Sequence, residues 1–420
     1  MRALLGLACL LAAGATAAAA PLPAPQWWKG NLHTHTLWSD GDDYPEVIAR
    51  WYKEQGYHFL SLTDHNRLQA GERWVDVAKS KGGMPALARY RKAWGEDWVK
   101  TRSVEGRLEV RLKSFQEFRG RVEAPGQFLM LQGIEVTDQY KAFPVHINVS
   151  NVQEPLKPQG GSNVVQVMQR NINAILEQRR RTGQPMLPHL NHPNFGWGIT
   201  AEEFLEVTGE PFFEVYNGHP LVRNEGDALH AGTERIWDIL LTRRLAERKG
   251  TVLYGLATDD AHNYHSVSNK LSNPGRGWVM VRAAELKPAA LIAALEAGDF
   301  YASTGVRLRE VRRSATELGV DIEAEPGVRY TTYFIGTRRG YDPANEPLRQ
   351  PTGEALRVTH RYSPDIGCEL AKVLGATATY TFRGDEIYVR AKVVSSKSMV
   401  NPMPAGEKQA AWVQPVVPRP

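Results

Sequence analysis

The feature that most constrains the fold is a series of seven short apolar segments, each of which ends in or carries a histidine or a carboxylate. They fall between residues 27 and 262 of the 420-residue chain, and amphipathic stretches separate them. Short β-branched runs that alternate with helical runs predict βα units around a parallel sheet. Because the C-terminal ends of barrel strands converge on one face, the polar residues that follow these segments should lie together.

Two of the seven segments end in polar residues spaced two apart, His33 with His35 and Asp260 with His262. Residues i and i+2 of a strand point to the same face, so each pair can bind one ion. Asp40 follows in a turn that can fold back over the first strand end. Taken alone, such a pair can equally be a polar strand end or a helix cap. The recurrence over seven strands favours a metal site.

The mixture of imidazoles and carboxylates favours Zn, Mn or Fe over Ca or Mg, which prefer oxygen ligands. A catalytic zinc takes about three protein ligands, so the number of candidates predicts a cluster of two or three divalent ions. His189 is an alternative to His192, and the spacing does not decide between them. The candidate ligands are His33, His35, Asp40, His65, Glu135, His146, His192, Asp260 and His262.

Residues 1–20 contain one arginine and then an apolar run that ends in small residues, the pattern of a cleaved signal peptide. A membrane anchor is the alternative, although the alanine-rich second half is weakly apolar. We therefore expect an exported protein, periplasmic or secreted, with no membrane association beyond export. After cleavage Cys368 is the one remaining cysteine, so an internal disulfide is excluded.

The rest of the chain divides into two predicted domains. Residues 21–305 carry the βα pattern, interrupted at about 67–126 by a charged segment that we interpret as a helical insertion, either a lid or a solvated face. Residues 306–420 contain alternating β-branched and aromatic runs between Gly, Pro and Asp turns, followed by a proline-rich end. They predict a small antiparallel β domain with an extended tail.

The net charge of +5 is spread along the chain instead of concentrated in one segment. A nucleic-acid surface would need a larger and more local excess, so nucleic acid is disfavoured as a partner. Mild attraction for a small anionic substrate is consistent with this charge. No feature of the sequence sets the oligomeric state.

The stretches HTHTLWSDG, LTDHN, GIE, HIN, NHPN and DDAH, in this order, resemble the PHP (polymerase and histidinol phosphatase) superfamily over about residues 27–305. LWSDG and GDFYASTG are most similar to its CehA/McbA-type metallohydrolase branch. The resemblance implies a distorted (β/α)7 barrel with a trinuclear metal centre, and it favours His192 over His189. It assigns one ion to His33, His35, Glu135 and Asp260, a second to Glu135, His146 and His192, and a third to Asp40, His65 and His262. The superfamily often has histidine where Asp40 stands.

Such a centre predicts a hydrolase in which adjacent cations lower the pKa of a bridging water toward about 7, giving a hydroxide nucleophile. The same cations offset charge on phosphoryl oxygens, so phosphoester hydrolysis is the first hypothesis. Carboxyl or carbamate ester hydrolysis on the same centre is the second, and a nuclease is the third. A non-catalytic periplasmic protein that binds metal or sugar is the alternative from another class, which the complete ligand set disfavours. The chain has no G-x-S-x-G elbow.

Other candidate site residues lie in loops or at strand ends near the same face. The candidate general acids are His219, His230 and His265, which are otherwise ordinary loop histidines. The candidate substrate or supporting contacts are Glu214, Tyr216 and Asn217 on the sixth strand, together with Arg223 and Arg276. Phe195 and Trp197 are either an apolar wall of the site or part of the core.

Overall fold

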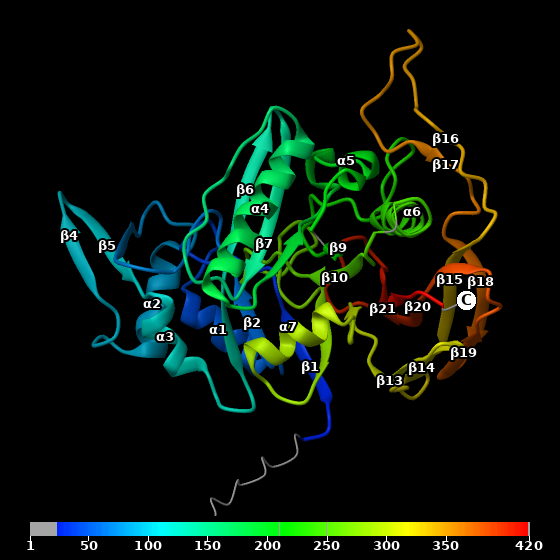
Figure 1. Cartoon of the computed structure of the whole chain (residues 1–420). Helices are drawn as coiled ribbons and strands as arrows, with labels where there is room; N and C mark the ends of the chain where they lie inside the picture. The colour runs from blue at the N-terminus through cyan, green and yellow to red at the C-terminus, as the bar shows by residue number, and fades with distance from the viewer. Residues whose placement is uncertain (1–22, 210, 249, 419–420) are drawn as a thin grey trace, which may run out of the picture.

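The computed structural model describes residues 23–418 except 210 and 249, and it shows a mixed α/β protein built around one large sheet (Figure 1). The expected signal peptide lies outside the described residues. No helix in the described part of the chain is both long and apolar enough to cross a membrane.

The first half of the large sheet is rich in parallel pairs. Its strands, in spatial order, are β10 (Tyr254–Thr258), β9 (Phe212–Asn217), β8 (Leu187–Leu190), β7 (Phe143–Ser150), β6 (Leu129–Tyr140), β2 (Phe59–Leu62) and β1 (Gln26–Asn31). Strands β1, β2 and β6 are parallel to one another, and so are β8, β9 and β10. Strand β7 is antiparallel to both of its neighbours, because two residues join it to β6 and so short a connection permits only a hairpin.

The predicted closed barrel is not observed among the described residues. Strand β10 has no strand pairing with β1, and the gap is bridged just beyond their ends by one isolated parallel bridge between Thr34 and Ala261. There the His35 N–H donates to the Ala261 carbonyl at 3.0 Å, and the Asp260 N–H donates to the His33 carbonyl at 3.0 Å. The two ends of this half-sheet therefore meet only where the predicted ligands begin.

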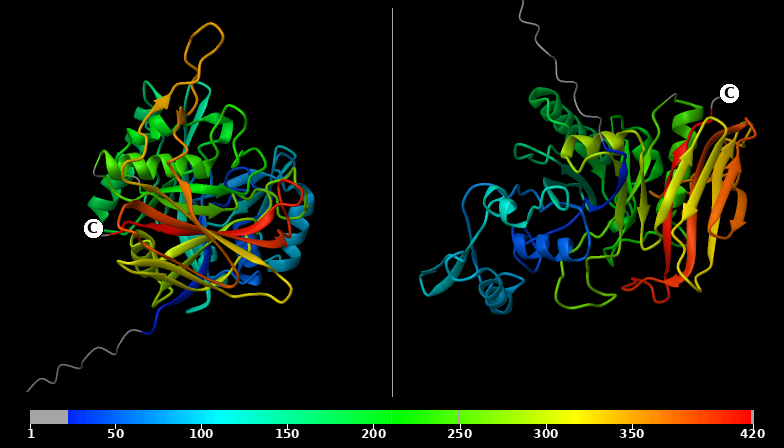
Figure 2. Two further views of the ribbon diagram at one scale, coloured as in Figure 1. Left: turned by 90° about the vertical axis from the view of Figure 1, so that its right-hand side faces the viewer. Right: turned by 90° about the horizontal axis from the view of Figure 1, so that it is seen from below.

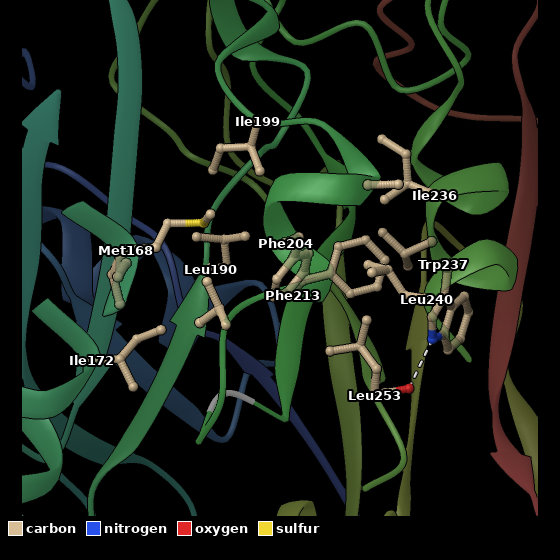
Figure 3. Packing of buried hydrophobic residues seen from close by; sticks show 14 of the residues in the cluster. Met168, Ile172, Leu190, Ile199, Phe204, Phe213, Ile236, Trp237, Leu240 and Leu253 are labelled. Atoms are coloured by element: carbon tan, nitrogen blue, oxygen red, sulfur yellow. Dashed lines mark hydrogen bonds between the residues drawn. The ribbon is translucent and has the colours of Figure 1, made fainter. Parts of the chain in front are cut away.

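Helices cover the outer face of the sheet and bury its apolar side chains. They are α1 (Pro45–Glu54), α4 (Val164–Thr182), α5 (Ala201–Leu205), α6 (Thr233–Ala246) and α7 (Pro288–Glu296). Asn163 caps the N-terminus of α4, where its side chain accepts from the Gln166 N–H. Gly183 caps the C-terminus in the left-handed conformation. Figure 3 shows the packing of α4, α5 and α6 side chains, with the Trp237 indole donating to the Leu253 carbonyl at 2.8 Å.

The segment predicted as a helical insertion contains helices but also a small sheet. Helices α2 (Gly83–Trp94) and α3 (Phe115–Val122) accompany the strands β3 (Arg73–Asp76), β4 (Thr101–Val104) and β5 (Arg107–Leu112), which pair in the order β3-β5-β4. Glu105 and Gly106 connect β4 to β5 with φ of 49° and 75°, as a tight hairpin turn requires. The sequence did not predict these strands, because their charged residues obscure the alternation of apolar and polar side chains. The insertion projects from one side of the molecule (Figure 1).

The C-terminal region is antiparallel, as expected, but its sheet continues that of the first domain. From β1 the large sheet runs on through β11 (Trp278–Ala283), β12 (Phe300–Ser303), β21 (Lys408–Val416), β20 (Glu386–Ser398), β15 (Tyr330–Arg338) and β18 (Cys368–Leu374). A second sheet of β13 (Leu308–Arg313), β14 (Glu317–Ile322) and β19 (Thr377–Thr381) packs beside it, as Figure 2 shows. An arm of this region contains the short pair β16 (Asn345–Glu346) and β17 (Arg361–Tyr362), and the loop between the two strands extends beyond the pair (Figure 1).

The predicted extended tail is a central strand of this sheet. Strand β21 pairs with both β12 and β20, and residues 410–416 are almost all buried. The sequence QAAWV supplies the apolar side chains for this position, but only the long-range pairing reveals it. The tail is therefore part of the core.

A buried ion pair joins the C-terminal sheet to helix α6. The Arg390 guanidinium donates to both carboxylate oxygens of Asp238 at 2.7 Å each, and the Tyr388 hydroxyl donates to the same carboxylate at 2.8 Å. Arg390 is 1% exposed and Asp238 is 4% exposed. The two regions are thus held by a desolvated polar contact as well as by the continuous sheet.

Candidate metal centre

The structure brings all nine predicted ligands together. His33 and His35 follow β1, Asp40 lies in the next turn, and His65 follows β2. Glu135 lies in β6 and His146 in β7, while His192 follows β8 and both Asp260 and His262 follow β10. The hairpin of β6 and β7 places Glu135 two pairs away from His146 in register, so both reach the same face.

Glu135 lies at the centre of this cluster and is fully buried. Its Oε1 lies 3.1 Å from His146 Nδ1, 3.5 Å from His33 Nε2 and 3.7 Å from His192 Nε2. Its Oε2 lies 3.7 Å from His35 Nε2 and pairs with His65. Burial opposes ionisation, but the surrounding imidazoles hold the pKa of Glu135 well below its usual range. One carboxylate thus faces five imidazoles, an arrangement suited to bridging two cations.

The ligand atoms fall into overlapping sets whose members lie within 4.8 Å of one another. The sets are His33, His35 and Glu135; Glu135, His146 and His192; His33, His192 and Asp260; and His35, Asp40, His65 and His262. Asp260 Oδ1 lies 3.3 Å from His33 Nε2 and 3.1 Å from His35 Nε2, which joins it to the first set. The geometry thus groups the residues as the resemblance implies, and it adds His35 to the set that contains Asp40.

Unpartnered polar atoms test whether these residues fit divalent cations. His35 Nδ1, Asp40 Oδ1 and His146 Nδ1 are buried atoms that make no hydrogen bond within the described residues, and the 3.1 Å approach of His146 Nδ1 to Glu135 Oε1 lacks hydrogen-bond geometry. A buried polar atom without a partner is destabilising by about 1–3 kcal/mol, which coordination to an ion would remove. Burial and the neighbouring His262 lower the pKa of His35 to about 3, so its imidazole is neutral, the form that binds metal. The donor set fits two or three divalent cations.

The geometry separates the two alternative histidines after β8. His192 Nε2 lies 3.7 Å from Glu135 and 3.8 Å from Asp260, inside the cluster. His189 Nε2 lies instead 3.5 Å from Glu214 and 3.3 Å from the Asn148 side-chain nitrogen, behind His33. His192 therefore lies in the sets around Glu135, whereas His189 forms a separate set of possible ligands with His33 and Glu214 behind the cluster.

Glu214, predicted as a substrate or supporting contact, is fully buried and supports the cluster from behind. It accepts from the His33 Nδ1–H at 2.6 Å, from the His192 backbone N–H at 2.8 Å and from the Thr258 hydroxyl at 2.8 Å. The Asn217 side chain donates both to Glu214 at 2.8 Å and to Asp260 at 3.2 Å. Both residues therefore hold the supporting position, one of the two alternatives that the sequence left open.

Tyr216 does not face the site. A β-bulge in the pairing of β9 with β10 sets Val215 and Tyr216 against one residue of β10 and reverses the alternation after Glu214. The Tyr216 ring therefore lies in the core, 5.7 Å from the Trp412 ring, with its hydroxyl toward Met399. The prediction that it contacts substrate was wrong.

Replacing Glu214 with glutamine should weaken metal binding by about 10–100-fold, the usual effect of losing a carboxylate behind a metal-bound histidine. The amide keeps the size of the side chain but no longer favours the tautomer in which His33 presents Nε2 to the cluster. Titration of the metal-free protein with Zn²⁺ would measure this change. Glu225→Gln, at an exposed site in the loop after the same strand, is the control. Equal affinity in wild type and Glu214→Gln would contradict the orienting role.

The three candidate general acids lie in different environments. His219 lines a cavity of about 450 Å³ together with Asp40 and His262, and its ring is 5.6 Å from that of His262. Its Nδ1 accepts from the Leu221 N–H at 3.2 Å, so the neutral ring carries its proton on Nε2. His230 instead stacks on Trp197 at 3.8 Å, and His265 pairs with the buried Asp43. Of the three, His219 is placed to reach a bound substrate.

The two candidate arginines do not face the cluster. Arg276 is fully buried, and its guanidinium donates to the carbonyls of Gly218, Leu271 and Ser268 at 2.8, 2.7 and 2.9 Å. It therefore clamps loops and cannot bind a phosphate here, which corrects the prediction. Arg223 is exposed and lines a separate hollow of about 290 Å³.

Phe195 forms an apolar wall of the site. The sequence alone did not decide whether it lines the site or belongs to the core. Its ring lies 5.1 Å from that of His192 and 5.9 Å from those of His146 and His219. Arg357, in the C-terminal arm, donates to the carbonyls of Trp197 and Gly198 at 3.0 and 2.6 Å and so holds the loop that carries Phe195. The C-terminal region therefore supports the site through this loop.

Sequence reasoning missed two cations at the mouth of the cluster. Lys81 and Lys270 line the same cavity as Asp40, His219 and His262. Lys81 comes from the insertion and Lys270 from the loop after β10. No local pattern marks either residue, because neither follows a strand end directly.

No family model matches the chain, and a search of the curated proteins found no match. One similar solved structure is a two-domain protein containing a predicted PHP-like metal-dependent phosphoesterase from Bacteroides vulgatus (14% identity, TM-score 0.39, covering 94% of this chain and 96% of that one). Others are PsfC from Pseudomonas syringae (14%, 0.31, 61% and 82%) and an amidohydrolase from Chromobacterium violaceum (14%, 0.28, 56% and 88%). Likenesses this distant carry no argument about chemistry.

Proposed function

We propose that the protein is a metal-dependent hydrolase of the PHP superfamily and that it hydrolyses phosphate esters. The observation that carries the proposal is the buried Glu135 carboxylate, which faces five imidazoles within overlapping sets of ligand atoms. Several of those atoms have no other partner. Placement in the CehA/McbA-type branch rests on LWSDG and GDFYASTG alone.

Two or three divalent ions, Zn, Mn or Fe, would supply water activation at neutral pH and offset the charge of a phosphoryl group. His33, His35, Glu135 and Asp260 would hold one ion. Glu135, His146 and His192 would hold a second, and Asp40, His65 and His262 would hold a third, with His35 beside the third set. Asp40 is 42% exposed at its side chain, which makes the third set the most open to solvent.

The protein's own groups supply orientation, shielding from water and a hydrogen bond to the leaving group. Glu214 fixes the His33 ring by accepting from its Nδ1–H, which leaves Nε2 free toward the cluster. Phe195 shields the His146 and His192 side of the site from water. Burial lowers the pKa of His219 to about 4, so its ring is neutral, and its Nε2–H is the proposed hydrogen-bond donor to the leaving oxygen of the ester, which takes its proton from water.

The runner-up is hydrolysis of carboxyl or carbamate esters, which the same donor set can support. A nuclease is disfavoured because the cavity at the cluster is small and the charge of +5 is spread along the chain. A non-catalytic metal- or sugar-binding protein is disfavoured by the complete ligand set. We also propose export to the periplasm or beyond, on the pattern of residues 1–20.

The test is release of phosphate from phenyl phosphate and of p-nitrophenol from bis(p-nitrophenyl) phosphate, with release of naphthol from naphthyl acetate as the carboxyl-ester assay. We expect turnover of a phosphate ester that a chelator abolishes and that Zn²⁺, Mn²⁺ or Fe²⁺ restores. Turnover of naphthyl acetate alone would establish the runner-up. A metal-loaded protein that turns over none of the three would contradict a hydrolase.

A further inference from the structure

The cavity at the mouth of the metal centre is built from segments that are distant in the chain. It measures about 450 Å³, within the range of sites for small molecules. The turn after β1 supplies Asp40, the insertion supplies Lys81, and the loops after β9 and β10 supply His219 and Lys270. The lining of the cavity therefore combines the predicted ligands Asp40 and His262 with two ammonium groups.

The two oxygens of the Asp40 carboxylate have different neighbours. Its Oδ1 lies 3.3 Å from His262 Nε2 and 3.6 Å from His65 Nε2, whereas its Oδ2 lies 3.2 Å from Lys81 Nζ. The turn that carries Lys81 is pressed against the Asp40 loop, since a Cβ at Gly82 would meet the Asp42 carbonyl at 2.5 Å. Lys81 is thus held beside the cluster by the insertion.

Lys270 is presented by a loop that buried side chains fix in place. The Arg276 guanidinium binds the carbonyls of Ser268 and Leu271, and the Asn273 side chain donates to those of Asn263 and Ser266 at 2.7 Å each. Lys270 is exposed, and no carboxylate of the described residues forms an ion pair with it. Its charge is therefore available to a ligand in the cavity.

The charges of this cavity do not balance within the protein. Lys81 and Lys270 face one carboxylate, Asp40, and one oxygen of that carboxylate is directed to the cluster. Resting on the proposed function, we infer that the cavity binds a second anionic group of the substrate, a carboxylate or phosphate on the alcohol part of a small phosphate ester. The scissile phosphate faces the metal ligands, and the second anion lies between Lys81 and Lys270.

Binding of non-hydrolysable probes to the metal-loaded protein tests this inference. Calorimetry would compare phenylphosphonate with 4-carboxyphenylphosphonate and 1,4-phenylenebisphosphonate. We expect at least one of the two probes with a second anion to bind about tenfold tighter than phenylphosphonate, and the tighter one identifies the anion. Equal affinity for all three probes would overturn the inference.

Variants show whether the two lysines are responsible. Lys81→Gln and Lys270→Gln should each reduce the preference for the second anion at least threefold. Lys79→Gln, in the same turn as Lys81 but outside the cavity lining, should keep it. Because Lys81 touches Asp40, its variant is also assayed for bound metal, and Lys270→Gln decides the matter if that metal is lost. A preference that survives in Lys270→Gln would overturn the role of this lysine pair.

Phosphate release from phenyl phosphate and 4-carboxyphenyl phosphate separates this inference from the proposed function. Release from both at equal kcat/KM, with equal probe affinities, would remove the inference and leave the phosphoesterase. Preferential probe binding without release from either ester would support the anion site and remove the phosphoesterase.

Discussion

Replacement of Glu135 by glutamine is expected to remove bound metal and to lower the rate of phosphate-ester hydrolysis more than about 100-fold. Loss of a residue that only supports a metal ligand costs up to about 100-fold, and loss of a ligand itself should cost more. The amide replaces an anionic oxygen that faces five imidazoles with a neutral group, and its NH₂ cannot bind a cation. The fold should survive, since a neutral side chain is less costly to bury than a carboxylate. Metal analysis and circular dichroism would measure the two properties.

Glu386→Gln is the matched control for this change. Glu386 is also buried, at 1% exposure, but it accepts from the Tyr380 hydroxyl in the C-terminal region. Its variant should keep the metal content and activity of the wild type. His33→Ala should lose metal and activity as Glu135→Gln does. Full activity in either site variant would contradict the assignment of the cluster.

Replacement of Arg390 by alanine is expected to lower the free energy of unfolding by about 3–5 kcal/mol, because it leaves a buried carboxylate without its partner. Asp238 would keep the Tyr388 hydroxyl but lose both hydrogen bonds from the guanidinium. The contact between α6 and β20 should weaken, and the midpoint of urea unfolding should fall. Urea titration followed by tryptophan fluorescence would measure the change.

The double variant Asp238→Leu with Arg390→Met separates the ion pair from simple packing. Replacing both partners by apolar groups of similar volume is often neutral or stabilising, so stability should return toward that of the wild type. A loss below about 1 kcal/mol in Arg390→Ala, the range of an exposed pair, would contradict a desolvated contact.

The sequence alone could group the candidate ligands because their positions depend on one rule. Residues that directly follow strands meet at one edge of a sheet whatever the exact register, so His33, His65 and Asp260 could be grouped without a structure. The antiparallel hairpin of β6 and β7 departs from the expected pattern, yet it still presents Glu135 and His146 to the same face.

The residues that sequence reasoning misplaced depend on features that no local pattern carries. A bulge turns Tyr216 into the core, and the burial of Arg276 follows from loops that converge on it. The central position of strand β21 depends on its pairing with β12, whose residues lie more than 100 positions earlier in the chain. Lys81 reaches the site because the insertion folds back onto the Asp40 loop.

The most direct test of the metal centre is anomalous X-ray diffraction from crystals of the metal-loaded protein, recorded at the absorption edges of Zn, Mn and Fe. We expect two or three anomalous peaks among the nine ligands, with one or more of them next to Glu135. For zinc, the peaks should lie about 2.0–2.2 Å from histidine nitrogens and carboxylate oxygens. A loaded crystal with no anomalous peak in the cluster, or with peaks only elsewhere on the protein, would contradict the metal centre and the hydrolase proposed from it.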